Sequence, residues 1–131
     1  MIDNATEFLD IDLNNLEYEL RRQAQLFHSV YSEYVKKSSM YDQICEELNV
    51  KESEKSLAFR LEQKQKSEKV TEKMVDEYLT LSPELQTLRA DKIAAKTDRE
   101  LLFSLVKALE HKREALKSVA FTSRNEVLPE E

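Results

Sequence analysis

Apolar residues recur at every seventh position through the first half of the chain. The series reads Leu13, Leu20, Phe27, Tyr34, Tyr41 and Leu48, and it follows Asp12, a residue type that caps helix N-termini. A companion series three residues further on is interrupted by Gln23 and Lys37. A period of seven keeps one stripe of a helix facing a partner helix. The pattern predicts a long helix over residues 12–66 with an irregular, coiled-coil-like seam.

Residues 82–84 read Ser-Pro-Glu and predict the start of a second helix. Serine caps a helix, proline is tolerated at its first position, and glutamate is favoured near its positive end. Every seventh residue afterwards is apolar: Leu88, Ala95, Leu102, Leu109 and Leu116, supported by Leu85, Leu105 and Val106. We expect a second long helix over residues 82–124, preceded by a connecting region at 67–81. The polar residues 62–73 are the expected site of the helix break.

These elements predict an all-α protein in which two long helices are joined by a short helix or loop. The expected single domain spans residues 12–125, between an acidic leader at 1–11 and an acidic tail at 126–131. A helix over residues 12–66 would be roughly 80 Å long, too long for the rest of the chain to cover its stripe. We therefore expect a homo-oligomer. Its predicted interface consists of Leu20, Phe27, Tyr34, Tyr41, Leu48, Leu102, Leu105, Leu109 and Leu116.

The amino-acid composition argues against several classes of function. The chain contains no glycine, so phosphate-cradling loops and hairpin-rich β folds are improbable. Its only cysteine, Cys45, and its two histidines, His28 and His111, do not form a zinc-binding pattern, and no nucleophile–base pair is readable. We expect neither an enzyme nor a metal or other cofactor. No apolar run is long enough to span a bilayer, and a single cysteine favours a reducing cytoplasm.

The net charge of -6 is unevenly distributed. Residues 1–20 hold six acidic and no basic residues, and residues 126–131 hold three more acids, so residues 21–125 carry 20 basic against 17 acidic residues, a net of +3. Basic side chains that share helix faces are candidate contacts to single-stranded DNA: Arg60, Lys64, Lys66, Arg113, Lys117 and Arg124. The other interpretation is that these are solvated surface charges paired with neighbouring glutamates.

Five short segments, in order, resemble the UvsY-like family of phage recombination mediators. They are LEYE at 16–19, VYSEYVKKSS at 30–39, LAFRLE at 57–62, LSPELQTLRAD at 81–91 and LKSVAF at 116–121. In the family these segments read L-x-Y-E, aliphatic-Y-S-x-aromatic, L-K-x-R-L-D, L-S-x(6)-basic-x-D and I-K-S-x-x-F. The resemblance covers most of residues 16–124.

The resemblance implies a small helical protein that forms a ring-like homo-oligomer through its C-terminal helix. It implies binding to single-stranded DNA coated by single-strand-binding protein, and help in loading a RecA-like recombinase. In the family the L-K-x-R-L-D segment contributes basic residues to DNA binding. Only its arginine carries over here, as Arg60, because the lysine position is Ala58. Lys64, one turn later, is our candidate replacement.

A structural coiled-coil protein, such as a phage assembly or scaffolding factor, is the alternative function. Both functions predict a helical oligomer, so oligomer size does not separate them. Binding to an oligonucleotide that weakens as salt rises separates them, because only a DNA-binding protein displaces counterions from phosphates.

Overall fold

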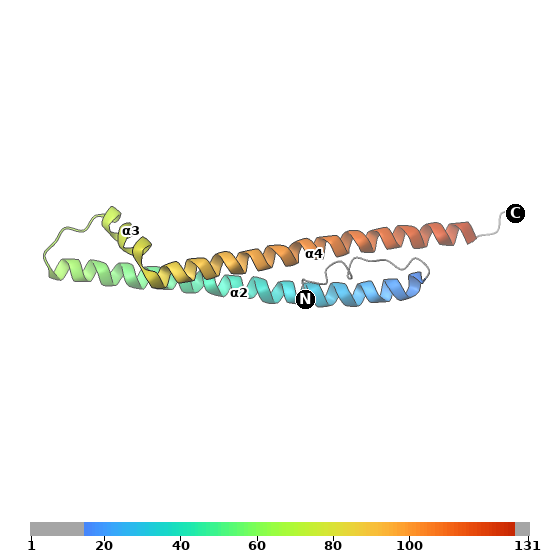
Figure 1. Ribbon diagram of the computed structural model, residues 1–131, viewed down its shortest axis with the longest axis horizontal. Helices are drawn as coiled ribbons and strands as arrows, with labels where there is room; N and C mark the ends of the chain where they lie inside the picture. Colours follow the sequence, from blue (N-terminus) through green and yellow to red (C-terminus); the bar gives the residue numbers. More distant parts are fainter. Residues whose placement is uncertain (1–14, 128–131) are drawn as a thin grey trace. The chain divides into compact units, whose positions relative to one another are not determined.

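The computed structural model describes the backbone of residues 15–127 and the side chains of residues 15–119 and 121. Three helices follow in order along this range, α2 at Leu16–Gln65, α3 at Glu72–Leu81 and α4 at Pro83–Val127 (Figure 1). No strand occurs within it. The two long helices pack against each other with the short helix between them in sequence, which confirms the all-α prediction. None of these helices is long and apolar enough to cross a membrane.

The start of α2 differs from the sequence prediction. The side chain of Asn15 accepts a hydrogen bond from the backbone N–H of Tyr18 at 3.1 Å, so Asn15 is the residue that caps the helix. Asp12, the predicted cap, lies outside the described residues. The start of α4 is as predicted. The Ser82 hydroxyl accepts from the backbone N–H of Leu85 at 3.4 Å, and Pro83 occupies the first helical position.

The end of α2 is a tight reversal made without glycine. Ser67 adopts a left-handed conformation with φ of 58°. Its backbone N–H donates to the carbonyl of Lys64 at 3.0 Å, and the next N–H, of Glu68, donates to Gln63 at 3.0 Å. These two bonds form a Schellman motif, which satisfies carbonyls that the end of a helix leaves unpaired. The predicted break within residues 62–73 is therefore a defined cap.

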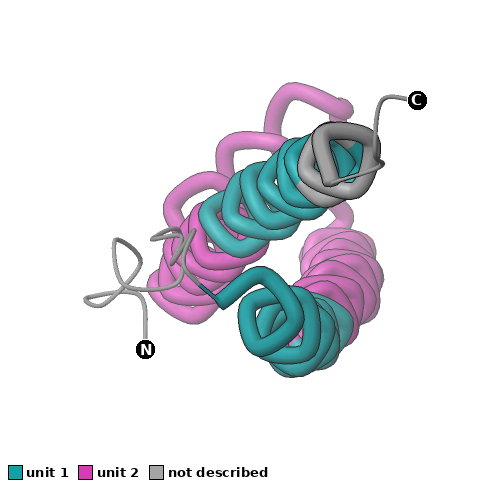
Figure 2. The backbone as a smooth tube through the Cα atoms, turned by 90° about the vertical axis from the view of Figure 1, so that its right-hand side faces the viewer, with its two compact units in different colours: residues 1–36, 100–131 teal, residues 37–99 magenta. Residues whose placement is uncertain are grey.

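The chain divides into two compact units (Figure 2). Unit 1 comprises residues 1–36 and 100–131. Within its described part, the first segment of α2 packs against the last segment of α4. The buried residues of this core are Val30, Leu102, Leu105, Val106 and Leu109, with Phe27 and Tyr34 packed against them. Burial of this apolar set is the main favourable contribution to the stability of unit 1.

Residues predicted to need a second copy for their burial are covered within one chain. Five of them are at most 8% exposed: Leu48, Leu102, Leu105, Leu109 and Leu116. The other four, Leu20, Phe27, Tyr34 and Tyr41, are partly buried. The chain reverses between α2 and α4, so the stripe of one helix meets the stripe of the other. The inference that the stripe is too long to bury is therefore corrected, because heptad spacing does not reveal which chain supplies the second helix.

Polar side chains interrupt the apolar core near the start of α2. Gln23, the predicted interruption of the second seam, is buried and donates to the buried Glu19 carboxylate at 3.4 Å. Arg22 donates to the same carboxylate at 3.2 Å. Pairing of this kind offsets the cost of removing a carboxylate from water.

Unit 2 comprises residues 37–99, including α3. The rings of Phe59 on α2 and Tyr78 on α3 stack with their centroids 4.6 Å apart, and Val75 of α3 is buried. The C-terminal carbonyls of α3 accept hydrogen bonds from side chains of α4: Leu79 from Arg89 at 3.3 Å, and Thr80 from Gln86 at 3.1 Å. Short as it is, α3 is thus held by contacts with both long helices.

The first turn of α4 is tied to α2 by an ion-pair cluster. The Glu84 carboxylate lies 3.0 Å from the Lys55 nitrogen and 3.5 Å from that of Lys51. The hydrogen bond from Lys55, reinforced by the charges of both lysines, holds the pKa of Glu84 below its ordinary value of 4.5. A carboxylate with a lowered folded-state pKa stabilises the fold above its unfolded pKa, and this contribution is lost as the pH falls through the folded-state pKa.

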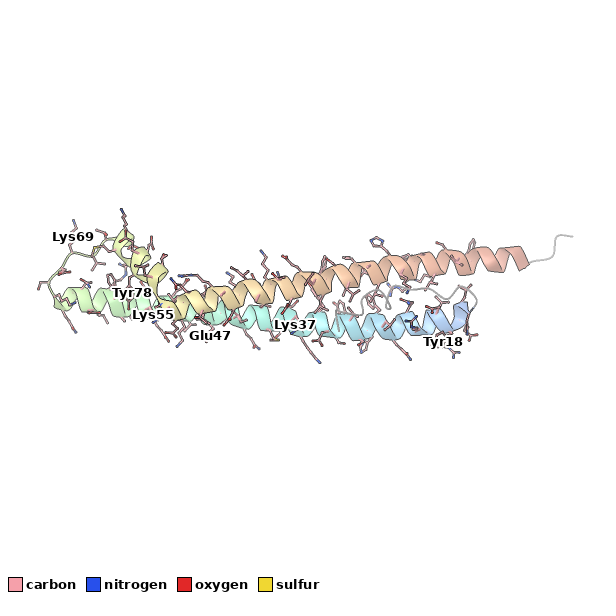
Figure 3. All side chains as sticks on the ribbon, viewed as in Figure 1. Tyr18, Lys37, Glu47, Lys55, Lys69 and Tyr78 are labelled. Atoms are coloured by element: carbon pink, nitrogen blue, oxygen red, sulfur yellow. The ribbon has the colours of Figure 1, made fainter. Side chains whose placement is uncertain are left out.

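We therefore expect Glu84→Gln to lower the melting temperature at pH 7, and this difference to disappear as the pH falls through the lowered pKa of the Glu84 carboxylate. Thermal unfolding followed by circular dichroism across this pH range measures the difference. Glu47→Gln is the matched control, since it removes the same charge from an exposed residue of unit 2 that makes no ion pair with a described residue (Figure 3). A difference between Glu84→Gln and the native chain that persists in acid would contradict the assignment.

Candidate nucleic-acid interface

The reversal between α2 and α3 carries an excess of positive charge. Residues 60–73 contain five basic and three acidic residues. Two of the basic residues are used in ion pairs, Arg60 with Glu72 at 2.8 Å and Lys66 with Glu62 at 3.3 Å. The remaining three, Lys64, Lys69 and Lys73, are exposed and form no ion pair with any residue that the structure describes. We call Lys64, Lys69 and Lys73 the reversal lysines.

The Schellman motif positions the reversal lysines. Lys64 lies in the last turn of α2, Lys69 follows the cap, and Lys73 lies in the first turn of α3. Figure 3 places Lys69 on the segment between the two helices. Because the motif fixes the backbone around Ser67, the three lysines lie on one short, ordered segment of the chain. Clustered cations on a fixed backbone can contact several phosphates of one strand.

Arg60 has a structural role, in an ion pair between α2 and α3, that the sequence did not predict. Its guanidinium reaches across to Glu72 of α3, and its Nε donates to the Ser56 hydroxyl at 3.4 Å. The arginine therefore helps to hold α3 on α2, and its charge is partly balanced by Glu72. Lys64, the conjectured replacement for the lysine missing at Ala58, carries no such partner within the described chain. Of the two, Lys64 is the better placed to meet a phosphate.

The C-terminal group of predicted contacts belongs to unit 1, whereas Arg60, Lys64 and Lys66 belong to unit 2. Arg113 lies over the ring of Phe27, with its guanidinium carbon 5.0 Å from the ring centroid. Lys117 pairs with Glu114 at 3.6 Å, on an exposed surface where such pairs are weak. Arg124 lies in α4, but its side chain is outside the described residues. Arg113, which is half-buried, and Lys117, which is exposed, lie one turn apart on α4, and each already has a contact within unit 1.

Sequence reasoning missed three basic residues that the structure brings forward. The sequence does not single out Lys69 and Lys73, because glutamates alternate with them and the spacing does not show which lysines those glutamates pair with. Lys107 lies over the ring of Phe103, with its nitrogen 5.3 Å from the centroid, and pairs with Glu110 at 3.2 Å. A signal was present for Lys107, since it lies four residues, or one helical turn, after Phe103.

The described residues contain no group of three or more metal-ligating side chains. Cys45 is partly buried and lies one turn after Tyr41. A hydrogen bond with the Cys45 thiol, together with partial desolvation, raises the pKa of Tyr41 above its ordinary value of 10.0. The hydrogen bond with Cys45 explains the orientation of the Tyr41 side chain on α2.

No protein-family model, curated protein or solved structure matches this chain. The resemblance to recombination mediators therefore rests on the five short segments of the sequence alone.

Proposed function

We propose that this chain binds single-stranded DNA and acts as a recombination mediator. In this role it helps to load a RecA-like recombinase onto strands coated by single-strand-binding protein. The observation that carries the proposal is the cluster of reversal lysines, three exposed cations without carboxylate partners among the described residues. The order of the five quoted segments supports the mediator role in particular.

The proposed mechanism requires no covalent chemistry. A protein that binds the strand more tightly in one coated state than in another shifts the population toward that state, by as much as the two affinities differ. A homo-oligomer, in the proposal a ring, would present the reversal lysines once per subunit. Linked sites of this kind bind one strand with an avidity that exceeds the affinity of each site. A weak affinity of the three lysines in each subunit is then sufficient.

The experiment that tests the proposal measures binding of a fluorescein-labelled oligo(dT) to the full chain by anisotropy, across a salt series. We expect log Kd to rise linearly with log salt concentration, with a slope of about 0.7 per phosphate contacted. We expect weaker binding to a duplex of equal length, because the proposed site is for single strands. Absence of binding in low salt would refute the proposal.

A second assay addresses the mediator role. Oligo(dT) is first saturated with a single-strand-binding protein, and the rate at which a RecA-like recombinase forms a filament is measured with and without this chain. Faster filament formation supports mediation. An unchanged rate, combined with intact DNA binding, would refute the mediator role and show that the chain only binds DNA.

A structural assembly protein is the alternative, and exposed apolar side chains favour it. Large hydrophobic residues are exposed in both units, among them Val35, Leu57, Leu61, Leu81, Ile93 and Phe121. Such side chains are typical of surfaces that another protein covers. The alternative predicts self-association without measurable affinity for oligo(dT), so the anisotropy experiment separates the two functions.

A further inference from the structure

Four aromatic rings form a continuous row in unit 1. Phe27 and Tyr31 of α2 stack with centroids 5.9 Å apart, Tyr31 and Tyr34 are 6.1 Å apart, and Tyr34 contacts Phe103 of α4 at 5.8 Å. Spacings of this size are those of interacting aromatic pairs. The row thus joins the two helices of the unit through ring contacts. We call these four residues the aromatic row.

The aromatic row has an anchored part and an open part. Phe27 and Tyr34 pack against the apolar core of unit 1. Tyr31 and Phe103 remain 46% and 45% exposed. An exposed ring supported from behind by fixed neighbours presents a rigid apolar face to solvent, and little conformational entropy is lost when a flat ligand stacks on it.

Cations lie on the same row. The nitrogen of Lys107 is 5.3 Å from the centroid of Phe103, and the guanidinium carbon of Arg113 is 5.0 Å from that of Phe27. Lys107 also pairs with the partly exposed carboxylate of Glu110 at 3.2 Å. Exposed pairs of this kind are weak, so a phosphate can replace the carboxylate at little cost.

The combination of aromatic rings and cations favours single-stranded nucleic acid over a second copy of the chain as the ligand of the aromatic row. A second copy of the chain could cover Tyr31 and Phe103, but lysine is depleted from the centres of protein–protein interfaces. Single-stranded nucleic acid needs both components, an aromatic face for each stacked base and a cation for the phosphate beside it. The combination of Phe103 with Lys107 supplies both within one turn of α4.

We propose that the aromatic row is a base-stacking site for single-stranded DNA, in which bases stack on Tyr31 and Phe103 as Lys107 leaves the Phe103 ring to contact the adjoining phosphate. This inference rests on the proposed function and extends it. The reversal lysines of unit 2 supply affinity for phosphate alone, whereas the aromatic row of unit 1 supplies affinity for bases. The full chain should therefore distinguish a normal strand from one that lacks its bases.

The test compares two probes of equal length and charge, oligo(dT) and an abasic oligonucleotide, at one salt concentration. We expect Tyr31→Ala and Phe103→Ala each to weaken oligo(dT) binding roughly five- to tenfold, with little change for the abasic probe. Tyr31→Phe should retain affinity, because it keeps the ring. Tyr18→Ala is the matched control, since Tyr18 is 56% exposed in the same unit and lies outside the row.

Tyr31→Leu distinguishes loss of the aromatic ring from a folding defect. It keeps an apolar contact with Phe27 while removing the aromatic face. We expect it to have the circular dichroism spectrum of the native chain and the binding defect of Tyr31→Ala. Unchanged oligo(dT) binding by the Tyr31 and Phe103 variants would overturn the base-stacking site. Equal losses for both probes with a fall in oligomer mass would also overturn it, and would assign the row to contact with a second copy. Failure of the native chain to bind either probe would refute the proposed function itself.

Discussion

Neutralising the reversal lysines is expected to weaken binding to single-stranded DNA about 100-fold at 0.1 M salt. For single strands each phosphate contact changes log K by about 0.7 per tenfold change in salt. Three contacts therefore contribute about two orders of magnitude at this concentration. The variant Lys64→Gln/Lys69→Gln/Lys73→Gln tests this by anisotropy with oligo(dT), and the slope of log Kd against log salt should fall by about 2.

A second triple variant removes the same charge elsewhere. Lys36→Gln/Lys37→Gln/Lys96→Gln changes lysines of α2 and α4 that lie outside the reversal and form no ion pair within the described residues. We expect it to bind oligo(dT) within about threefold of the native chain, because only long-range attraction is lost. Equal losses for the two triple variants would show that net charge rather than the reversal determines binding. Sedimentation of both variants checks that oligomer mass is unchanged.

Truncation of the core is expected to have the largest effect on stability. Leu109 is 1% exposed within the core of unit 1, so Leu109→Ala leaves a cavity and should lower the free energy of unfolding by about 2–4 kcal/mol. Leu101→Ala makes the same change on the same helix at a residue that is 50% exposed, and should cost less than about 1 kcal/mol. Urea unfolding followed by circular dichroism measures both values.

The same pair of variants addresses self-association. If Leu101→Ala proves as costly as Leu109→Ala, Leu101 is buried in an assembly and the single chain does not account for the stability. Repeating the unfolding at several protein concentrations distinguishes these cases, because the stability of an assembly depends on concentration whereas that of a single folded chain does not.

Local signals in the sequence predicted the helices well. The start of α4 follows from Ser82 and Pro83, because capping depends on residues within one turn. The start of α2 did not follow in the same way, since Asp12 and Asn15 are both residue types that cap helices and the local sequence does not choose between them. The short helix α3 was contained in the predicted connecting region, where Met74 and Tyr78 already show helical spacing.

Sequence patterns did not predict contacts between residues far apart in the chain. The heptad stripe predicted which residues are covered, but it did not predict that Leu102 and Leu109 would be covered by the same chain. The pairing of Arg60 with Glu72 joins residues twelve positions apart on different helices, and it removes one of the predicted DNA contacts from the set of unpaired cations. Likewise, the aromatic row depends on Phe103 reaching α2, which no spacing within α4 reveals.

The left-handed residue at the end of α2 has a consequence for engineering and for evolutionary change. A side chain in this conformation crowds the following carbonyl, and only glycine avoids that cost of about 1 kcal/mol. We therefore expect Ser67→Gly to stabilise the protein without changing any of the neighbouring lysines. Drift toward β-branched residues at that position would instead destabilise the cap of α2 next to the reversal lysines.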